Sequence, residues 1–219
     1  MTNNVTITPK DAKKYVISYN TLRKAVGILG IALPIILVMG VLILDNQSQP
    51  LNSISSYSHT RMGNGLVGTM SAVALFMFSY LGHDFRDNLL GHLAGIFALG
   101  VAFFPNNVPD PWTTINIIHL CSAFSFFVIL ILFSLWLFPK SNLKVLTQQK
   151  KNRNMVYKIC GYCMIVFIAL IIVYKAWFIK IFPEHGIFQP VFWLESFALL
   201  AFGISWITKG QVIYKDKLE

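Results

Sequence analysis

Residues 115–138 read INIIHLCSAFSFFVILILFSLWLF, an apolar run interrupted only by small polar residues and one histidine. As an α-helix this run would be about 36 Å long, which exceeds the roughly 30 Å hydrocarbon core of a bilayer. Its apolar residues are continuous and do not alternate with polar ones, which argues against a strand of an outer-membrane barrel. Backbone groups in lipid must bond within their own segment, so the run predicts a transmembrane helix.

Five more apolar segments accompany this run, and the composition of the whole chain agrees with them. They span residues 25–44, 65–81, 89–104, 156–179 and 191–208. Of the 219 residues, 55% are hydrophobic and only 12% are charged, which is about half the charged fraction of a soluble domain. We therefore predict an all-α integral membrane bundle of six transmembrane helices over residues 25–209, preceded by a segment at 1–24 and followed by a tail at 210–219.

Lysine and arginine lie almost entirely on one side of the predicted membrane. When six helices are threaded, the basic residues of 1–24, of the turn at 82–88, of the connection at 140–158 and of the tail share that side. Arg61, Lys175 and Lys180 remain for the other side. By the positive-inside rule, both ends of the chain are then cytoplasmic. The net charge of +9 predicts anionic lipid headgroups at the inner leaflet as partners, and no nucleic acid.

Three ionisable residues are expected at one depth inside the membrane. His119 and Glu195 each lie about five residues into a helix that enters from outside, and Lys175 lies about five residues before the outer end of its helix. All three should therefore sit roughly 7 Å below the surface. A charge in hydrocarbon costs about 2.5 kcal/mol or more, so each residue needs a partner. Two arrangements provide one: a polar pocket open to the outside, or a Glu195–Lys175 ion pair with His119 hydrogen-bonded in the packing.

His119 also has polar neighbours on its own helix face. Asn116 and Ser122 lie about one turn to either side of it. Ser122 could act as a nucleophile, with His119 as its general base and Glu195 orienting the imidazole. No oxyanion hole can be recognised in the sequence, so this triad is a hypothesis about chemistry and not a motif match.

A metal site is the second chemical alternative. His59, His119 and Glu195 could bind zinc and leave an open position for water, with Asp110 or His185 as a further ligand. The chain has no tight metal motif such as H-E-x-x-H. No cofactor is required by the sequence, and zinc is the metal expected if there is one.

The segment at 45–64 supplies most of the candidate ligand-binding residues. The full set comprises Tyr57, His59, Arg61, Asn64, Asn116 and Lys175. Residues 63–68 read GNGLVG, formally a G-x-G-x-x-G, but no strand precedes them, so dinucleotide binding is excluded. The start of a helix beside Arg61 could instead attract an anionic headgroup.

The turn at residues 82–88, GHDFRDN, should begin the third helix. Asp87 or Asn88 is the expected N-cap, because a short polar side chain there accepts a hydrogen bond from a free backbone amide. Asp84 is expected to pair with Arg86. These features predict structure and not function.

Five stretches distributed along the chain carry a family resemblance. They are SISSY (53–57), GHD to AFFP (82–105), IH (118–119), RNMVY (153–157) and FWLE to SW (192–206). Together they resemble a family of bacterial membrane proteins of unknown function, over nearly the whole chain after residue 22. The resemblance implies a multi-pass protein of the bacterial inner membrane, with His119 and Glu195 as motif residues. Family members often have Met-Arg-Asp where this chain has Met62-Gly63-Asn64, so the carboxylate of that motif is missing here.

A broader likeness rests on the Phe-Pro pair at 104–105 followed by His119 near the start of the next segment. It is similar to the pattern of the six-helix group that includes the DRAM autophagy modulators and the GPI-lipid-remodelling proteins, and it implies a lipid-related role. The ceramidase-like hydrolases, which bind zinc through histidine, are a more distant analogy. This chain has six predicted helices where they have seven, and it lacks paired histidines on its last helix.

We therefore expect a membrane protein that binds, senses or modifies a lipid or small amphiphile in an outward-opening pocket, with a lipid hydrolase as its enzymatic form. The alternatives are a transporter or channel with an intramembrane His/Glu site for a proton or ion, and a non-catalytic scaffold. The sequence leaves open whether the protein is an enzyme and in which oligomeric state it works.

Overall fold

The computed structural model describes residues 9–82, 84–106, 113–141, 145–184 and 187–214. Over these ranges the chain is helical and contains no strand. The α-helices are α1 (Pro9–Leu44), α2 (Gly63–Phe78), α3 (Phe85–Phe103), α4 (Thr114–Leu132), α5 (Gln148–Val173) and α6 (Pro190–Lys209). A 3₁₀-helix, η1 (Ser55–His59), lies between α1 and α2, and π-helices extend α4 as η2 (Phe133–Leu137) and α5 as η3 (Tyr174–Phe178).

Four helical stretches are long and apolar enough to cross a membrane. They are Tyr19–Leu44, Thr114–Leu137, Gln148–Phe178 and Pro190–Lys209. Large apolar side chains such as Ile35 and Ile172 are exposed along them, as suits a surface that faces lipid. The prediction of an all-α membrane bundle is confirmed at this level, and the chain is a multi-pass membrane protein. By contrast, α2 is a shorter apolar helix of 16 residues, and α3 has charged residues in its first turn.

The first helix is longer than the apolar segment that predicts it. α1 begins at Pro9, inside the segment at 1–24. The predicted boundary at residue 25 is therefore not a helix boundary. The part of α1 that is apolar enough to cross a membrane begins at Tyr19.

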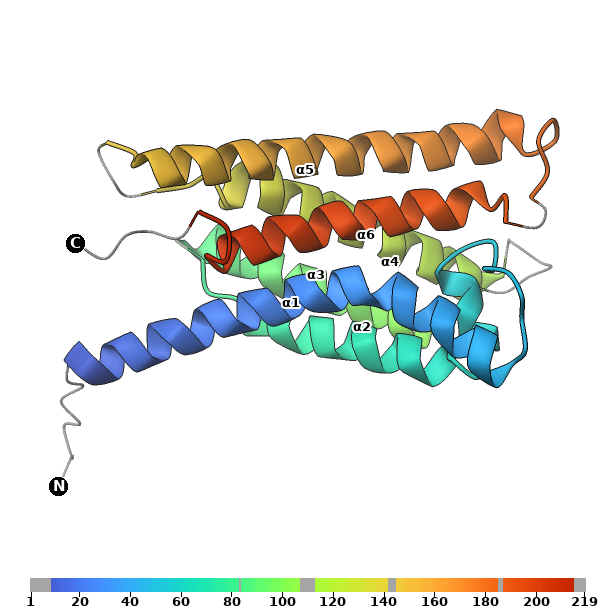
Figure 1. Cartoon of the computed structure of the whole chain (residues 1–219), viewed down its shortest axis with the longest axis horizontal. Coiled ribbons are helices and arrows are strands. Elements are labelled where there is room, and N and C mark those ends of the chain that lie inside the picture. The colour runs from blue at the N-terminus through green and yellow to red at the C-terminus, as the bar shows by residue number, and fades with distance from the viewer. Residues whose placement is uncertain (1–8, 83, 107–112, 142–144, 185–186, 215–219) are drawn as a thin grey trace, which may run out of the picture.

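The helices lie side by side, with their axes along the long dimension of the molecule (Figure 1). The end of α1, η1 and the start of α6 lie at one end, which we call the loop end. The α2–α3 turn and the end of α6 lie at the opposite end, which we call the basic end. α6 packs between α1 and α5, and α3 packs between α2 and α4.

α1 and α6 approach so closely that glycine is required on both sides of their crossing. A Cβ atom on Gly27 would lie 2.7 Å from the carbonyl oxygen of Gly203, and one on Gly203 would lie 2.5 Å from the carbonyl oxygen of Gly27. Both neighbours are backbone atoms, which cannot move aside as a side chain can. Small residues let membrane helices pack closely, so this crossing fixes how α1 meets α6.

An aromatic cluster fills the half of the bundle nearer the basic end. The Trp206 ring of α6 contacts Tyr80, Phe133, Phe138 and Phe202, with ring centroids 5.9, 5.4, 5.2 and 6.0 Å away. All five side chains are buried. Aromatic pairs at these separations add to the stabilisation from burial itself, so this half of the interior is densely packed.

Both local predictions for the turn before α3 are wrong. The N-cap is Asp84, whose side chain accepts a hydrogen bond from the Asp87 amide at 3.0 Å, and not Asp87 or Asn88. The ion pair of Asp84 is with Lys140, 3.3 Å away, and not the expected one with Arg86. Lys140 also binds the buried carboxylate of Asp87. Lys140, the partner of both carboxylates, lies just beyond η2 and far from the turn in the chain. The sequence of the turn alone therefore does not indicate it.

These contacts shift the pKa values of the groups in the turn. The hydrogen bond from the Asp87 amide, followed by Lys140, holds the pKa of Asp84 below its ordinary value. The hydrogen bond to Asp87 raises the pKa of Lys140. Because the pKa of Asp84 is lowered in the folded state, its contribution to stability is present above a pH of about 4 and is lost as the pH falls below that.

Replacement of Asp87 by asparagine should destabilise the folded chain by about 1–2 kcal/mol. The change removes a charge-assisted hydrogen bond at a buried position and leaves the Lys140 charge behind. The matched control is Asp45→Asn, which removes the carboxylate of the pair with Arg61, whose side chain is 72% exposed. This control should cost less than about 1 kcal/mol. Thermal unfolding of the full chain in detergent measures both, and equal losses would contradict the assignment.

Candidate functional site

His119 is positioned by the start of α4. Thr113 caps this helix by accepting a hydrogen bond from the Asn116 amide at 3.3 Å. One turn further on, the His119 side chain is buried and its Nδ1 atom lies 2.7 Å from the Phe104 carbonyl oxygen. A carbonyl can only accept, so Nδ1 carries a hydrogen and donates it. In the neutral ring, Nε2 is then the nitrogen that can take up a proton.

Glu195 is positioned by the start of α6 and by the loop that precedes α2. α6 begins with Pro190 at its first position, where a missing amide hydrogen costs nothing. Oε2 of Glu195 accepts a hydrogen bond from the Ile54 amide, with the two atoms 2.6 Å apart. The residues are 141 positions apart in the chain, so this bond ties the loop at 45–62 to α6.

His119 and Glu195 line one cavity of about 60 Å³. α1, α2 and α3 contribute only apolar side chains to its wall, among them Leu33, Met70 and Val101. Ile54 and Ser55 of the loop complete it. A buried water needs about 10–15 Å³ of such a cavity, so the cavity has room for a few waters or one small polar group.

The loop over this cavity is held by hydrogen bonds among its own residues. The Ser53 hydroxyl lies 2.7 Å from that of Ser56 and 3.2 Å from that of Ser55. The Tyr57 hydroxyl accepts a hydrogen bond from the Leu51 amide at 3.2 Å, and burial raises the pKa of Tyr57. Tyr57 is fully buried, so it anchors the loop.

The remaining candidates in this region lie apart from the cavity. His59 forms a hydrogen bond of 2.6 Å through Nε2 with the Asn106 carbonyl. Arg61 pairs with Asp45, 3.3 Å away. Arg61 and Asn64 line a separate surface hollow of about 350 Å³ at the start of α2. Thus the sequence-predicted ligand set does not form one site.

Lys175 and Ser122 do not join His119 as the sequence suggested. Lys175 lies on η3 and is exposed, and the residues that line the cavity include none from α5 or η3. The charge of Lys175 nevertheless acts on Glu195, the residue with which the sequence suggested an ion pair. Ser122 is buried at the α3–α4 contact, where its hydroxyl packs against Gly100. The two lie so close that a Cβ on Gly100 would be 2.3 Å from the hydroxyl oxygen of Ser122. Asn116 is also buried and is not part of the cavity wall.

The zinc alternative has no geometric support in the described ranges. Within them, no three His, Cys, Asp or Glu side chains gather as a metal ion would require. His59 is held at Asn106 and not at the cavity. Asp110 and His185 lie outside the described residues.

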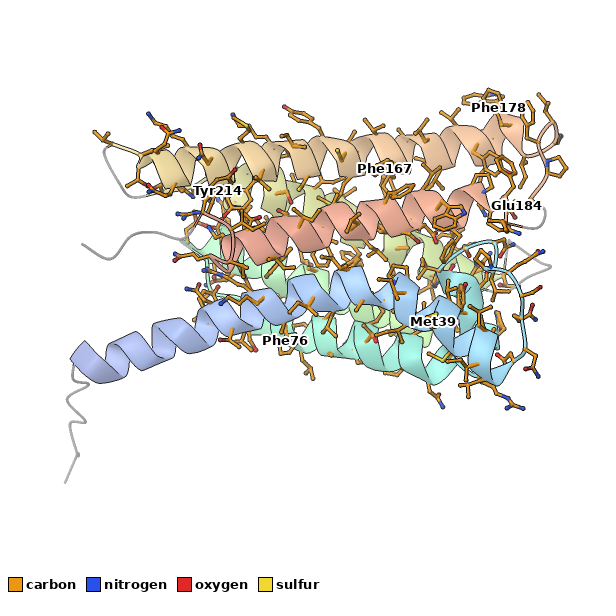
Figure 2. All side chains as sticks on the ribbon, in the orientation of Figure 1. Met39, Phe76, Phe167, Phe178, Glu184 and Tyr214 are labelled. Carbon is orange, nitrogen blue, oxygen red and sulfur yellow. The ribbon has the colours of Figure 1, made fainter. Side chains whose placement is uncertain are left out.

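An apolar groove of about 330 Å³ runs between α1 and α6. Its walls include Pro34, Met39, Phe192 and Trp193, and Met39 lies on the part of α1 nearer the loop end (Figure 2). The one hydroxyl in the groove, that of Ser196, donates to the Phe192 carbonyl at 2.7 Å. The groove therefore offers apolar contact and little hydrogen bonding. Sequence reasoning missed it, since it depends on which faces of α1 and α6 meet.

No protein-family model, curated protein or solved structure matches the chain. The family resemblance drawn from the sequence therefore stays a prediction.

Proposed function

We propose that all six α-helices cross the cell membrane, with the basic end in the cytoplasm and the loop end outside. Lys140, Lys150, Arg153 and Lys209 all lie at the basic end, which supports this orientation under the positive-inside rule. α2 is about 24 Å long as a 16-residue helix, shorter than the hydrocarbon core. Local thinning of the bilayer accommodates such a helix at a modest cost.

Labelling of single cysteines tests this orientation. Exposed positions on the two sides are Lys151 of α5 and Ser48 of the loop. In a background with Cys121, Cys160 and Cys163 replaced, a membrane-impermeant thiol reagent applied to sealed cells should label Ser48→Cys and leave Lys151→Cys unlabelled until the cells are opened. External labelling of Lys151→Cys in sealed cells would contradict the orientation.

We infer that the protein binds a single-chain amphiphile with a small polar head. The observation that carries this function is the pair of ionisable side chains, His119 from α4 and Glu195 from α6, in the wall of one largely apolar cavity. Ionisable groups inside membrane proteins mark functional sites by default, because leaving them in hydrocarbon is costly. A cavity of about 60 Å³ accepts a hydroxyl or an amine, and it is too small for a phosphocholine group.

The groove between α1 and α6 supplies a place for the chain of such a molecule. Phe192 borders the groove, and its ring packs against Tyr57 with the centroids 6.0 Å apart. Tyr57 belongs to the loop whose residues Ile54 and Ser55 wall the cavity. The polar head and the apolar tail of the amphiphile would therefore meet at this loop. The loop has to move to admit the ligand.

Binding is favoured over the other functions by the surroundings of the cavity. A Ser122 nucleophile has no support, since its hydroxyl packs at Gly100. Transport would need a path toward the basic end, and the buried rings around Trp206 occupy that half of the interior. A scaffold alone would not need His119 and Glu195 at a cavity.

The test uses a long-chain alcohol that carries a photoreactive diazirine in its chain. It should label peptides of α1 and α6 in the full chain in detergent. His119→Gln and Glu195→Gln should each weaken binding about tenfold, because each removes one polar contact to the head. The matched controls are His92→Gln, an exposed histidine of α3, and Glu184→Gln, a carboxylate at the loop end, and both should bind normally.

Two further measurements distinguish binding in the cavity from binding on the lipid-facing surface of the protein. Ala123→Phe fills the cavity and should abolish labelling, whereas Val128→Phe, at an exposed position of the same helix, should not. Unlabelled hexadecanol should compete with the probe, and hexadecylphosphocholine, with its large head, should compete poorly. Labelling that is insensitive to Ala123→Phe and to head size would contradict the proposed function.

A further inference from the structure

Two polar groups in the wall of the His119–Glu195 cavity are hydrogen-bond acceptors. Oε2 of Glu195 accepts from the Ile54 amide, and within the described part of the chain Oε1 makes no hydrogen bond. Nδ1 of His119 donates to the Phe104 carbonyl, so Nε2 of the neutral ring is an acceptor. An ionised carboxylate also accepts only, so neither group offers a hydrogen to a ligand.

Ser55 adds a third acceptor to the same wall. Its hydroxyl oxygen accepts a hydrogen bond from Nδ2 of Asn106, 3.3 Å away, and lies 3.2 Å from the hydroxyl oxygen of Ser53. A hydroxyl oxygen has two lone pairs, and Ser55 can donate its hydrogen to Ser53, so one lone pair of Ser55 remains for a ligand. The other side chains described in the wall are apolar. A ligand in this cavity therefore has to supply the hydrogen-bond donors.

The charges near the cavity favour a positive ligand. Among the described residues, Lys175 attracts Glu195 and Glu184 repels it, so these two charges oppose each other. Lys175 is exposed and lies outside the cavity wall, and no described side chain forms a direct ion pair with Glu195. A carboxylate inside a membrane bundle is stabilised by a cation in direct contact, and a ligand can supply that cation.

We propose that the head of the bound amphiphile is a primary ammonium group. The inference rests on the proposed amphiphile site and names the class of its ligand, a long-chain primary amine. An ammonium group has three N–H donors, one for each of the three acceptors, and places a positive charge opposite Glu195. A hydroxyl group has one O–H donor and no charge. An alkylamine has a pKa near that of lysine, about 10.4, so it is protonated at neutral pH.

Related head groups fit the cavity less well. A trimethylammonium group carries the same charge but has no N–H, and its three methyl groups are too bulky for a cavity of about 60 Å³. The carboxylate of a fatty acid would place a second negative charge beside Glu195. The cavity should therefore distinguish amphiphiles that share a chain and differ only in the head.

Competition against the diazirine alcohol tests the head group in the full chain in detergent at neutral pH. Hexadecylamine should displace the probe at a concentration at least tenfold below that of hexadecanol, because a hydrogen bond between charged groups is about twice as strong as a neutral one. Hexadecyltrimethylammonium, with the same chain and charge, should compete at least tenfold more weakly than hexadecylamine. Hexadecanoate should not compete.

Glu195→Gln removes the charge and keeps an oxygen acceptor in the cavity. It should abolish the preference for hexadecylamine over hexadecanol, so the amine loses about tenfold more affinity than the alcohol does. The matched control is Glu184→Gln, which removes a carboxylate outside the cavity wall and should change the preference less than threefold. If Glu195→Gln does not fold, the comparison of hexadecylamine with hexadecyltrimethylammonium decides, because it uses the wild type alone.

The failure of this inference can be told from the failure of the proposed function. Probe labelling that is insensitive to Ala123→Phe contradicts the amphiphile site itself. If the probe binds in the cavity but hexadecylamine competes no better than hexadecanol or hexadecyltrimethylammonium, only the ammonium head is overturned. A preference for the amine that survives Glu195→Gln unchanged would arise away from the cavity and would overturn the inference as well.

Discussion

The carboxylate of Glu195, set inside a bundle of apolar helices, is the constraint on which the loop end depends. A carboxylate without a donor in such surroundings is strongly unfavourable, and here the donor is the backbone amide of Ile54. That bond brings the loop down onto α6, so Tyr57 becomes buried against Phe192. One polar interaction thereby defines both the wall of the cavity and the surface that borders the groove.

The two ends of the molecule satisfy their buried polar groups in different ways. At the loop end, backbone amides and carbonyls partner the side chains: Ile54 donates to Glu195, and Phe104 accepts from His119. At the basic end, backbone carbonyls accept from cations, as Phe138 does from Lys150. Between them lies the aromatic cluster around Trp206, which keeps the two ends chemically separate.

The sequence alone predicts features that depend on how far along a helix a residue lies. It does not predict features that depend on the direction in which a side chain points around the helix axis. Apolar runs predict the helices, and equal distances from two helix starts predict that His119 and Glu195 share a depth. Lys175 was expected at the same depth, and its charge does act on Glu195, but its side chain is exposed on η3 and does not line the cavity. Ser122 shares a helix face with His119, but its hydroxyl packs against α3 in the space left by Gly100, which has no side chain. The partner of Asp84 comes from beyond η2, which no local pattern indicates.

Hydrogen exchange at the Ile54 amide tests the central claim, that Glu195 holds the loop over the cavity. Glu195→Ala removes the acceptor, and exchange at Ile54 should accelerate about tenfold or more, since a hydrogen bond to a charged group contributes about 1.5–3 kcal/mol. Glu195→Gln keeps an oxygen acceptor and should exchange more slowly than Glu195→Ala. Glu184→Ala, the control at the same end, should match the wild type. Unchanged exchange at Ile54 in Glu195→Ala would contradict the account.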